Sequence, residues 1–460
     1  MTELRLPRAG LAAFATGSFG MGIWVTVPGL LLLYFLTDIL AVTPLLAGAT
    51  LLIPKIADVV LHPWVGTLSD ADLARRGHRR RLLLIGCALV VAFAGLFTVP
   101  PALTGPAAAG WVAVAFIAGN LLFAAYQVPY LSTPADLTIG YHERTRLMGF
   151  RMVVLTIGIL AGGIAAPLLA RQAGYATMAA VLGGLMLAAL LVGVTGVGRL
   201  AATAAATAAA TAAATAAATA AATAAATALP QRPETGHGLL VALRDRQFRR
   251  LTGSYLAMST TSHLVLAGVP YYAKYALGRP GLTTVLVAAF LAPALVATPV
   301  WVRVARRYGK QRGLLAAQAA FVAGCLVLAA GSAAGHAVVV GAVVVLGVAF
   351  AALQLLPFSM LPDVVAHSGR PQRAGSYTGV WTATDSLGGA LGPYVYAACL
   401  ALGGFVASTG DETVPQPGSA IVWIRLGFGA VPATFMLVAL LLQRSYTLDG
   451  RLTALSAPRP

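Results

Sequence analysis

Twelve long apolar runs dominate this chain of 460 residues, and each is close to the length that a helix needs to cross a bilayer. A transmembrane helix takes about 20 predominantly apolar residues. Hydrophobic residues make up 58% of the chain and charged residues only 10%, whereas about a quarter of a soluble chain is charged. The sequence therefore predicts an all-α polytopic membrane protein with twelve transmembrane helices. These helices are expected at residues 10–36, 44–69, 82–102, 110–134, 147–170, 175–198, 249–276, 281–305, 313–332, 336–361, 375–404 and 421–443.

The placement of the positive charges predicts the orientation of these helices. The formal net charge is +17, and Lys and Arg together number 31. If successive helices alternate in direction, all but six of these cations fall on one side of the membrane. Because Lys and Arg concentrate in short cytoplasmic loops, we expect both termini in the cytoplasm and no nucleic-acid partner. The six exceptions are Lys55, Arg151, Arg171, Lys274, Arg279 and Arg425.

The first apolar run and the overall composition indicate the compartment. Residues 10–36 form a run too long for a signal peptide and lack a clear cleavage site, so we expect a retained membrane helix. An Ala-rich, Lys-poor composition is typical of GC-rich bacterial genomes. We therefore expect a multi-pass protein of the bacterial plasma membrane, present as a monomer.

A low-complexity segment divides the chain into two parts of similar length. Thr recurs at every fourth position from Thr203 to Thr227 in a tract that is otherwise almost entirely Ala. Arg199 and Arg232 flank this tract, and a thirteenth crossing would invert every later loop. We interpret it as a partly helical cytoplasmic linker or as a repeat without function. The predicted parts are residues 1–198, the linker 199–248, residues 249–443 and the cytoplasmic tail 444–460.

The two parts also resemble each other in sequence. Three polar residues of the first part recur in the second at a constant offset of 227, and each set lies beside a Pro-aromatic pair. Two six-helix repeats are typical of secondary transporters, whose solute site lies between the repeats near the membrane midplane. We therefore predict two pseudo-symmetric six-helix halves. The matched residues are Gln127, Asp136 and Arg146 in the first half and Gln354, Asp363 and Arg373 in the second.

Short motifs in both halves resemble one known family. Residues 66–70 read GTLSD and residues 76–80 read RGHRR, a combination that resembles the loop motif of the major facilitator superfamily. Its long form is typical of the glycoside–pentoside–hexuronide:cation symporters, the melibiose-permease branch. Residues 55–58, 129–138 and 357–363 are similar to further segments of that branch. The resemblance implies the major facilitator fold and secondary active transport by alternating access. Animal lysolipid symporters are similar to the same branch, so the resemblance leaves the substrate open.

Several positions depart from the family pattern. Asp58 matches the first cation-binding carboxylate of helix 2, but His62 stands where the second is usual. Gly22 and Gln127 stand at the positions of the sugar-binding carboxylates of helices 1 and 4. Arg151 matches the helix 5 arginine, while the usual helix 11 lysine is absent beside Asp385.

The predicted cation-coupling site consists of Lys55, Asp58 and His62, which share one face of helix 2. A charge near the middle of a membrane helix costs about 2.5–3.5 kcal/mol, so such residues usually form ion pairs or line a wet cavity. Asp58 beside two cationic groups suits a proton better than sodium, because Asp and His both exchange protons. We therefore expect H+ as the coupling ion and no further cofactor or metal. The alternative is an ion pair of Lys55 with Asp58 that only locks helix packing.

Polar and aromatic residues inside other helices are candidates for binding the substrate. Asp385 is an isolated acid in an apolar helix, and it could equally have a structural role. Aromatic side chains could stack on a sugar face or contact an acyl chain, although most pack or anchor at the interface. Tyr126 and Tyr255 are further aromatic residues of this kind, and His263 and Gln354 are weaker candidates, since a lone polar residue more often forms an interhelical hydrogen bond. The predicted substrate-binding residues are Gln127, Arg151, Asp385, Trp24, Tyr130, Gln354 and Trp381.

Charged residues in the loops between helices are predicted to act as a gate. Such groups can form charge-assisted contacts between helix ends in one conformation and lose them in the other. A purely topological role would explain any single Arg, but not paired acids at equivalent positions of the two repeats. The predicted gating residues are Asp70, Arg76, Arg79, Arg80, Asp136, Arg144, Arg146, Asp363 and Arg373.

These features predict a cation-coupled symporter, with H+ favoured, of a small solute such as a glycoside. Its partners would be that small-molecule substrate, the coupling cation and the lipid bilayer. Two alternatives remain: a transporter of lysolipids, other amphiphiles or drugs, and a membrane sensor that does not transport and docks through residues 199–248. An enzyme is not expected, because the chain has no Walker-type loop or zinc signature. The three cysteines lie in apolar runs without disulfide or metal spacing.

Overall fold

The chain folds into a bundle of long helices. The computed structural model describes residues 6–76, 79–136, 141–219, 244–330, 335–367, 374–409 and 414–448. Within these ranges the only strand-like pairing is an isolated antiparallel bridge between Leu40 and Thr409. The helices are α1 (Arg8–Asp38), α2 (Pro44–Arg76), α3 (Arg80–Gly86), α4 (Leu89–Phe97), α5 (Gly105–Asp136), α6 (Tyr141–Thr219), α8 (Arg246–Tyr271), η1 (Tyr272–Ala276), α9 (Leu282–Tyr308), α10 (Lys310–Ala330), α11 (His336–His367), α12 (Ala374–Leu402), α13 (Gly418–Phe428) and α14 (Ala430–Arg444).

Each predicted apolar run coincides with one or two of these helices, and the all-helical membrane architecture is confirmed. In the part of the chain that the structure describes, eight helical segments are long and apolar enough to cross a membrane by length and composition. One of them, Arg146–Thr203, contains two of the predicted runs, and α2, α8 and α12 are not among the eight. The count of twelve crossings therefore stays a prediction.

Breaks in the helices fall where glycine or proline interrupts the backbone. Gly174 has φ 83° and ψ 164°, and it divides α6 into two helical parts between the predicted runs. Only glycine adopts such a backbone conformation easily. Helix α4 ends at Phe97, before the predicted boundary at residue 102, because Pro100 and Pro101 cannot continue a helix. Gly429 separates α13 from α14.

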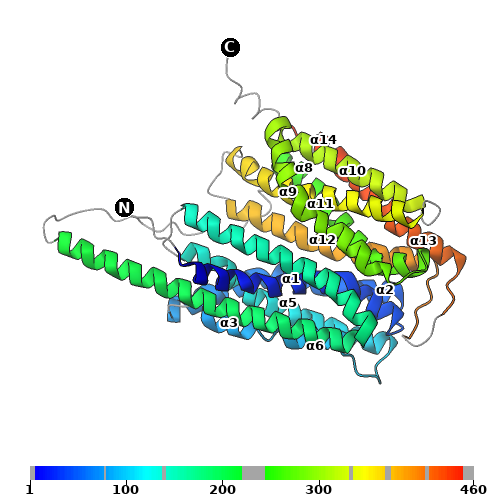
Figure 1. Cartoon of the computed structure of the whole chain (residues 1–460), viewed down its shortest axis with the longest axis horizontal. Coiled ribbons are helices and arrows are strands. Elements are labelled where there is room, and N and C mark those ends of the chain that lie inside the picture. Colours follow the sequence, from blue (N-terminus) through cyan, green and yellow to red (C-terminus); the bar gives the residue numbers. More distant parts are fainter. Residues whose placement is uncertain are drawn as a thin grey trace, which may run out of the picture.

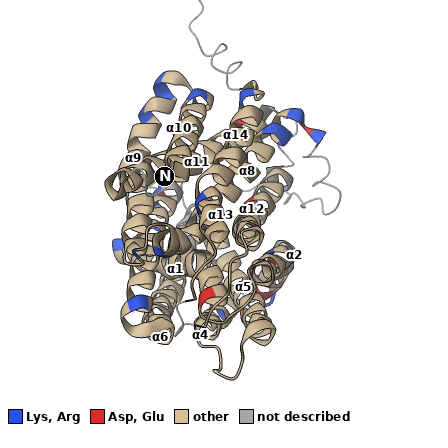
Figure 2. Cartoon of the chain, turned by 90° about the vertical axis from the view of Figure 1, so that its right-hand side faces the viewer, with Lys and Arg blue, Asp and Glu red and all other residues tan. Residues whose placement is uncertain are grey.

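The helices form two bundles that lie side by side (Figure 1). An N-terminal bundle contains α1 to α6, and a C-terminal bundle contains α8 to α14; the end-on view shows the same division (Figure 2). The bundles meet where α1 packs on α8, α2 on α12 and α6 on α9. We call the end of the molecule at which α1 and α8 begin the terminal end, and the end at which they finish the distal end.

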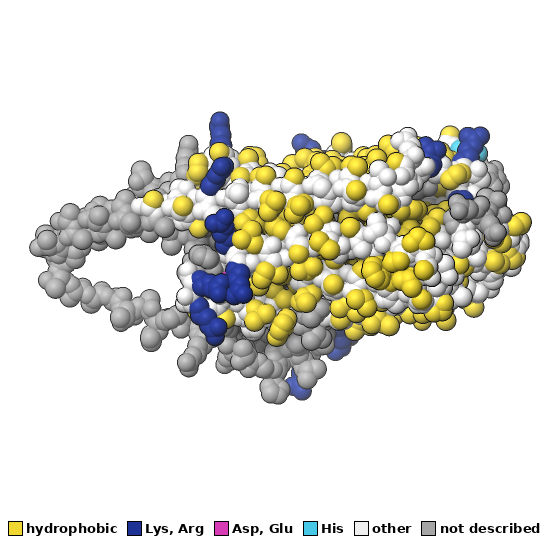
Figure 3. Space-filling model, turned by 90° about the horizontal axis from the view of Figure 1, so that it is seen from below, with side chains coloured by type: hydrophobic (Ala, Val, Ile, Leu, Met, Phe, Trp, Pro, Cys, Tyr) yellow, Lys and Arg dark blue, Asp and Glu magenta, His cyan; other side chains and the backbone are white. Residues whose placement is uncertain are grey.

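The outer surface of the bundles is largely apolar. Val91, Val114 and Val296 are each more than 65% exposed, as expected for side chains that face lipid. In the space-filling view, hydrophobic side chains form a broad band, with a row of Lys and Arg at one end of the band and a few more at the other end (Figure 3). The surface is therefore that of a protein embedded in a bilayer.

Helix α6 continues well past the predicted end of its second run at residue 198. It remains helical to Thr219, so the first part of the Ala/Thr tract is helical, and it projects beyond the rest of the bundle (Figure 1). Ala201, Ala202 and Ala206 are exposed. The remainder of the tract, including Thr227, lies outside the described residues.

Candidate functional site

A cavity of about 190 Å³ lies between the two bundles. Helices α1, α2 and α5 form its wall on the N-terminal side, and α8 and α12 form the opposite wall. This is the position expected for the solute site of a transporter built from two halves. The residues that line it are Trp24, Val25, Pro28, Gly29, Leu51, Lys55, Asp58, Phe116, Phe123, Gln127, His263, Thr382, Asp385, Ser386, Gly389 and Pro393.

Lys55 and Asp58 of α2 line this cavity together. The Lys55 ammonium nitrogen is 3.9 Å from a carboxylate oxygen of Asp58, and the Asp58 side chain is only 6% exposed. Lys55 also lies 5.7 Å from the centre of the Phe116 ring, close enough for a cation–π contact. The structure thus brings two of the three predicted coupling residues to the cavity. The side chain of His62 lies outside the described residues.

Asp385 of α12 faces the same cavity from the opposite bundle. Its Oδ1 accepts hydrogen bonds from the Tyr255 hydroxyl at 2.8 Å and the Ser259 hydroxyl at 3.1 Å. Both donors are on α8, and Nδ1 of His263, one turn further along, lies 2.9 Å from the Ser259 carbonyl oxygen. Two hydroxyl donors stabilise an acceptor oxygen inside a membrane helix, where an unsatisfied polar group is costly. The arrangement holds one carboxylate oxygen in place at the cavity wall.

Helix α8 is less apolar than the helices that it packs against, among them α1, α12 and α14. Tyr255, Ser259 and His263 recur at every fourth position of α8, so they lie along one face of the helix. We did not predict Ser259, but a search of the sequence for polar residues at this spacing would have found it. The same search would have made Tyr255 a stronger candidate for the site. Intramembrane polar residues on an inward face typically mark a solute or ion path.

An aromatic group forms the N-terminal wall of the cavity. Trp24 of α1 packs against Phe93, Phe116 and Phe123, with ring centroids 6.1–6.4 Å apart. Gln127 of α5 lines the cavity beside them. Trp24 and Gln127 are therefore placed where they can contact a bound solute.

Two predicted substrate-binding residues, Arg151 and Tyr130, lie behind this wall and do not line the cavity. The Tyr130 hydroxyl contacts the Ser18 hydroxyl at 2.9 Å and donates to the Phe14 carbonyl, and its ring stacks on Phe14. Arg151 is 7% exposed and lies 6.0 Å from the centre of the Tyr130 ring. These contacts join α1, α5 and α6 within the N-terminal bundle, so their observed role is packing.

Trp381 and Gln354 are also absent from the cavity lining. The Trp381 ring is 2% exposed and stacks on Tyr255 at 4.1 Å, so it supports the residue that bonds Asp385. Gln354 of α11 is exposed and lies outside the lining. The sequence shows which residues share a face of a helix, but it does not show whether that face lies against the cavity or against a neighbouring helix.

Gly22 lies at a close crossing of α1 and α6. A Cβ atom at Gly22 would be 2.6 Å from the Leu155 carbonyl oxygen and 2.7 Å from the Ile159 nitrogen. Across the interface, a Cβ atom at Gly158 would be 2.3 Å from the Phe19 carbonyl oxygen. Backbones this close leave no room for any side chain. The carboxylate of the family pattern cannot be accommodated at position 22 in this conformation.

The predicted gating residues that the structure describes form contacts within one bundle. Asp363 pairs with Lys310 at 2.6 Å, which ties α11 to the start of α10. Arg79 donates to the Ser69 hydroxyl at 2.6 Å, and Arg76 lies 3.5 Å from Asp72. Lys310 is not among the predicted gating residues, and its pairing with Asp363 is visible only in the tertiary structure. Arg80 is exposed.

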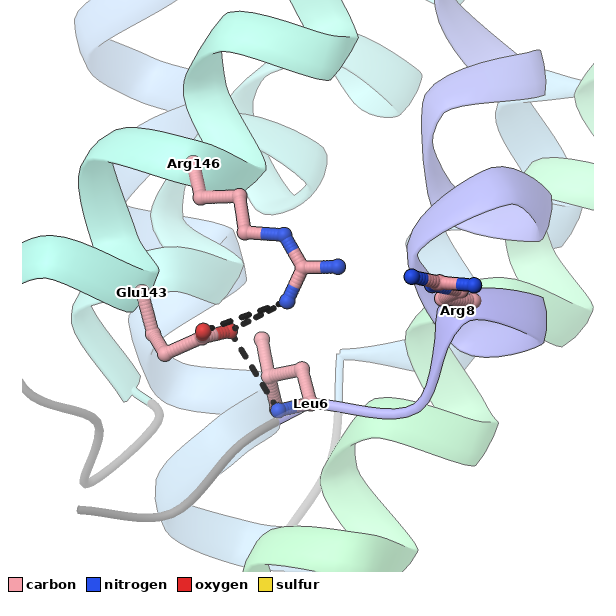
Figure 4. Close-up of a pocket in the computed structure, with 4 residues that line it drawn as sticks. All are labelled: Leu6, Arg8, Glu143 and Arg146. Atoms are coloured by element: carbon pink, nitrogen blue, oxygen red, sulfur yellow. Dashed lines mark hydrogen bonds and ion pairs between the residues drawn. The ribbon is translucent and has the colours of Figure 1, made fainter.

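Arg146 lines a second, more open pocket of about 430 Å³ at the terminal end (Figure 4). Its guanidinium is 3.1 Å from a carboxylate oxygen of Glu143, which also accepts the backbone N–H of Leu6 at 3.3 Å. Glu143 thus joins the start of α1 to the start of α6. The side chains of Asp70, Asp136 and Arg144, and the whole of Arg373, lie outside the described residues.

Metal ligation has no geometric basis in the described part of the chain. Within it, no three His, Cys, Asp or Glu side chains come together to hold a metal ion. The titratable groups instead gather at the cavity as Lys55 with Asp58 on one wall and Asp385 with His263 on the other.

Comparisons with known proteins identify the class to which this architecture belongs. The family described as MFS/sugar transport protein matches residues 13–450, so the chain belongs to that family of the major facilitator superfamily. The nucleoside transporter NupG has the same fold, with a TM-score of 0.63 and 12% sequence identity over 96% of this chain and 99% of NupG. At 12% sequence identity, this structural similarity supports the fold but not a shared function.

Two relatives carry the names of symporters or sugar transporters. The uncharacterized symporter sll1374 of Synechocystis sp. is 26% identical over 517 aligned residues, covering 94% of this chain and 93% of that protein. The isoprimeverose transporter of Lactiplantibacillus pentosus is 28% identical over 170 residues, covering 36% of this chain and 35% of that protein. They agree with the glycoside–pentoside–hexuronide:cation symporter branch. The chain is a multi-pass secondary transporter rather than an enzyme, with a small-molecule substrate and a coupling cation.

Proposed function

We propose that this chain carries a small hydroxylated solute, such as a glycoside, together with a proton. One observation carries the proposal: the Lys55–Asp58 pair and Asp385 face a single cavity from opposite bundles. A solute in that cavity can contact both halves at once, which couples its binding to their relative movement.

The Lys55–Asp58 pair favours a proton over sodium as the coupling ion. Two unit charges about 4 Å apart interact by roughly 4 kcal/mol at an effective dielectric constant of about 20. The Lys55 ammonium, 3.9 Å from Asp58, therefore opposes a sodium ion at the same carboxylate. A proton instead neutralises Asp58 and frees Lys55 for another partner. Protonation can thereby change the contacts of α2 without a dedicated ion cage.

The cavity walls suit a solute that has hydroxyl groups and one apolar face. Asp385, Gln127 and His263 offer hydrogen-bond partners, whereas Trp24 and Phe123 offer flat aromatic surfaces. Sugars present both kinds of surface, since their hydroxyls lie at the rim and their C–H groups on a face. The name of the isoprimeverose transporter supports the same class of solute.

A second candidate function is transport of an amphiphile such as a lysolipid. The observation in its favour is the apolar character of the N-terminal wall, where Val25, Pro28 and Leu51 accompany the aromatic group. The close packing at Gly22 also removes the acid that the family pattern places on helix 1. An acyl chain against this wall, with its headgroup at Asp385, would use the same cavity.

The remaining assignments complete the proposed transporter. It lies in the plasma membrane of a bacterium as a monomer, with both termini in the cytoplasm. Residues 1–198 and 249–443 form the two moving halves, residues 199–248 the linker and residues 444–460 the tail. The charged residues of the terminal end, among them Arg79 and Asp363, gate the cytoplasmic side.

The proposal is tested by proton movement in proteoliposomes with a pH-sensitive dye outside. Alkyl glycosides, uronides and lysolipids are added in turn, with and without sodium at fixed membrane potential. We expect alkalinisation outside with a glycoside, loss of this signal in Asp58→Asn, and at least tenfold weaker apparent affinity for the solute in Asp385→Asn. The matched control is Thr434→Val, which changes an exposed hydroxyl on α14 far from the cavity lining.

Each alternative gives a different result in this assay. A signal with lysolipids alone would support the amphiphile. Uptake that requires sodium at constant pH would overturn proton coupling. If folded protein gives no pH change with any of the added solutes, proton symport of these solute classes would be contradicted.

A further inference from the structure

A partly buried charged cluster joins the two bundles at the distal end. Asp38 is the last residue of α1, and its side chain is 2% exposed. Lys274 of η1 donates to Oδ2 of Asp38 at 2.6 Å, and the hydroxyl of Tyr275 donates to Oδ1. Both carboxylate oxygens of one bundle are thus bound by residues of the other. We call Asp38, Lys274 and Tyr275 the distal cluster.

Backbone contacts reinforce this junction. The segment after α12 runs across the end of α1, where the Ser408 N–H donates to the Thr37 carbonyl at 2.9 Å. The Ala41 N–H donates in turn to the Ser408 carbonyl at 3.1 Å. The Thr37 hydroxyl also contacts the Tyr271 hydroxyl of α8 at 2.6 Å. The bundles are therefore held at this end by side-chain and backbone hydrogen bonds together.

The distal cluster lies between the central cavity and the distal surface. Gly29 is the last α1 residue that lines the cavity, and Asp38 is nine residues further along the helix. At about 1.5 Å per residue, the cluster lies roughly 14 Å from the cavity wall. A solute that leaves toward the distal end must pass this junction.

The polar contacts at the terminal end have a different pattern. Lys310 pairs with Asp363 within the C-terminal bundle, and Arg146 pairs with Glu143 within the N-terminal bundle. Gln247 at the start of α8 bonds Thr447, which follows α14 in the same bundle. Among the described residues, the ion pair that crosses between the bundles is that of the distal cluster. The molecule is therefore fastened at its distal end in this conformation.

We propose that the distal cluster is the distal gate of the transport cycle, and that its opening is required for the cavity to reach that side. Alternating access requires the bundles to separate at the distal end once in each cycle, because the cavity lies between them. Separation takes the buried Asp38 carboxylate away from its partly exposed partner Lys274. The strength of this pair sets how often the distal side opens. Weakening it shifts the population toward the distal-open state.

The gate is tested by the side from which the cavity can be labelled. Thr382→Cys provides a reporter on the cavity wall, in a background where Cys87, Cys325 and Cys399 are replaced by Ala. A membrane-impermeant maleimide is applied to sealed vesicles of each orientation. Exposed markers identify the two sides: Arg279→Cys at the distal end and Thr447→Cys at the terminal end.

With the distal cluster intact, we expect the reporter to react mainly from the terminal side. Lys274→Ala should raise the distal labelling rate about tenfold, since Asp38 then loses its cation. Lys274→Arg should leave the rate near its original value, and the exchange Asp38→Lys with Lys274→Asp should restore part of the closure. Arg279→Ala removes an exposed cation nearby, and it should change nothing.

The result that would overturn the gate is an unchanged distal labelling rate in folded Lys274→Ala protein. Equal labelling from both sides before any change to the cluster would overturn it as well. If Lys274→Ala fails to fold, Tyr275→Phe tests the same point, because it removes one hydrogen bond and keeps the ion pair. A smaller increase of the distal rate, about threefold, is then expected, and no increase would count against the gate. The labelling needs neither a solute nor a proton gradient, so failure of the proposed symport would leave this result intact.

Discussion

Gly22 and Gly158 show how a single residue determines what the N-terminal wall can recognise. Their backbones approach so closely that a Cβ atom on either would overlap backbone atoms of the other helix. Backbone atoms cannot move aside as a flexible side chain can, so any residue other than glycine would force α1 and α6 apart. Position 22 of α1 therefore cannot present a carboxylate, and the acids that line the cavity are Asp58 of α2 and Asp385 of α12.

Gly22→Ala is expected to destabilise the protein by about 1–3 kcal/mol, the usual range for overpacking a close-packed interior. The measurement is thermal unfolding of detergent-purified protein. Gly110→Ala is the matched control, because no atom lies within 4 Å of its added methyl group. An equal effect of both substitutions would show that the close crossing of α1 and α6 does not limit stability.

Among the elements, α8 shows why a helix that faces a polar cavity escapes a search by hydropathy. Its Ser254 hydroxyl bonds the Ala439 carbonyl, Gln318 donates to Ser254, and Ser259 bonds Asp385. These three hydrogen bonds are made to protein rather than to lipid, while the buried Thr252 hydroxyl of the same helix has no hydrogen-bond partner among the described residues. The helix can therefore lie inside a membrane bundle although α8 is missing from the eight candidate spans.

Helix α6 differs from α8, because its last part projects beyond the bundle and consists only of Ala and Thr. Removing residues 204–215, which are three repeats of the tract, should leave transport within about twofold of the original rate. The reason is that the tract is Ala-rich helix projecting from the bundle, remote from the cavity. Uptake by reconstituted protein is the measurement. A second variant replaces the same twelve residues with Gly and Ser. It keeps the length of the tract and therefore tests whether its sequence matters.

A large loss of transport in the shortened variant alone would show that the linker length limits the movement of the halves. A loss in both variants would point to a specific docking role of the tract, as the sensor alternative requires.

At the scale of the whole molecule, transport depends on repeated closure of the distal interface. Besides the distal cluster, α2 and α12 pack closely there, and a Cβ atom at Gly48 would be 2.7 Å from the Ala397 Cβ atom. It would also be 3.2 Å from the Tyr394 ring. Small residues of this kind let helices approach and separate as units.

Gly48→Leu should act as a wedge between α2 and α12. We expect at least a fivefold lower transport rate with solute binding retained, because the distal side no longer closes fully. Transport and equilibrium binding are measured on the same reconstituted protein. Gly184→Leu, at an exposed position of α6 with no atom within 4 Å, is the control. Unchanged transport in Gly48→Leu would argue that α2 and α12 do not approach this closely during the cycle.

The sequence by itself determined the membrane class, the helical segments, the family and the main intramembrane charges. These properties are local, because the cost of desolvating a charge or a backbone group depends on the segment that carries it. Asp58 and Asp385 could be singled out for that reason, and both line the cavity. The motif of residues 66–80 could likewise be recognised from the sequence alone, without knowing which residues it contacts.

Only the tertiary structure decided which of the candidates meet one another. Tyr130 and Trp381 satisfy the same sequence pattern as Trp24, yet they pack against neighbouring helices while Trp24 faces the cavity. Asp38 and Lys274 end two apolar runs more than 200 residues apart, and nothing in either run indicates that they form an ion pair. A contact of this kind depends on the relative rotation and depth of two helices, which packing sets and hydropathy does not encode.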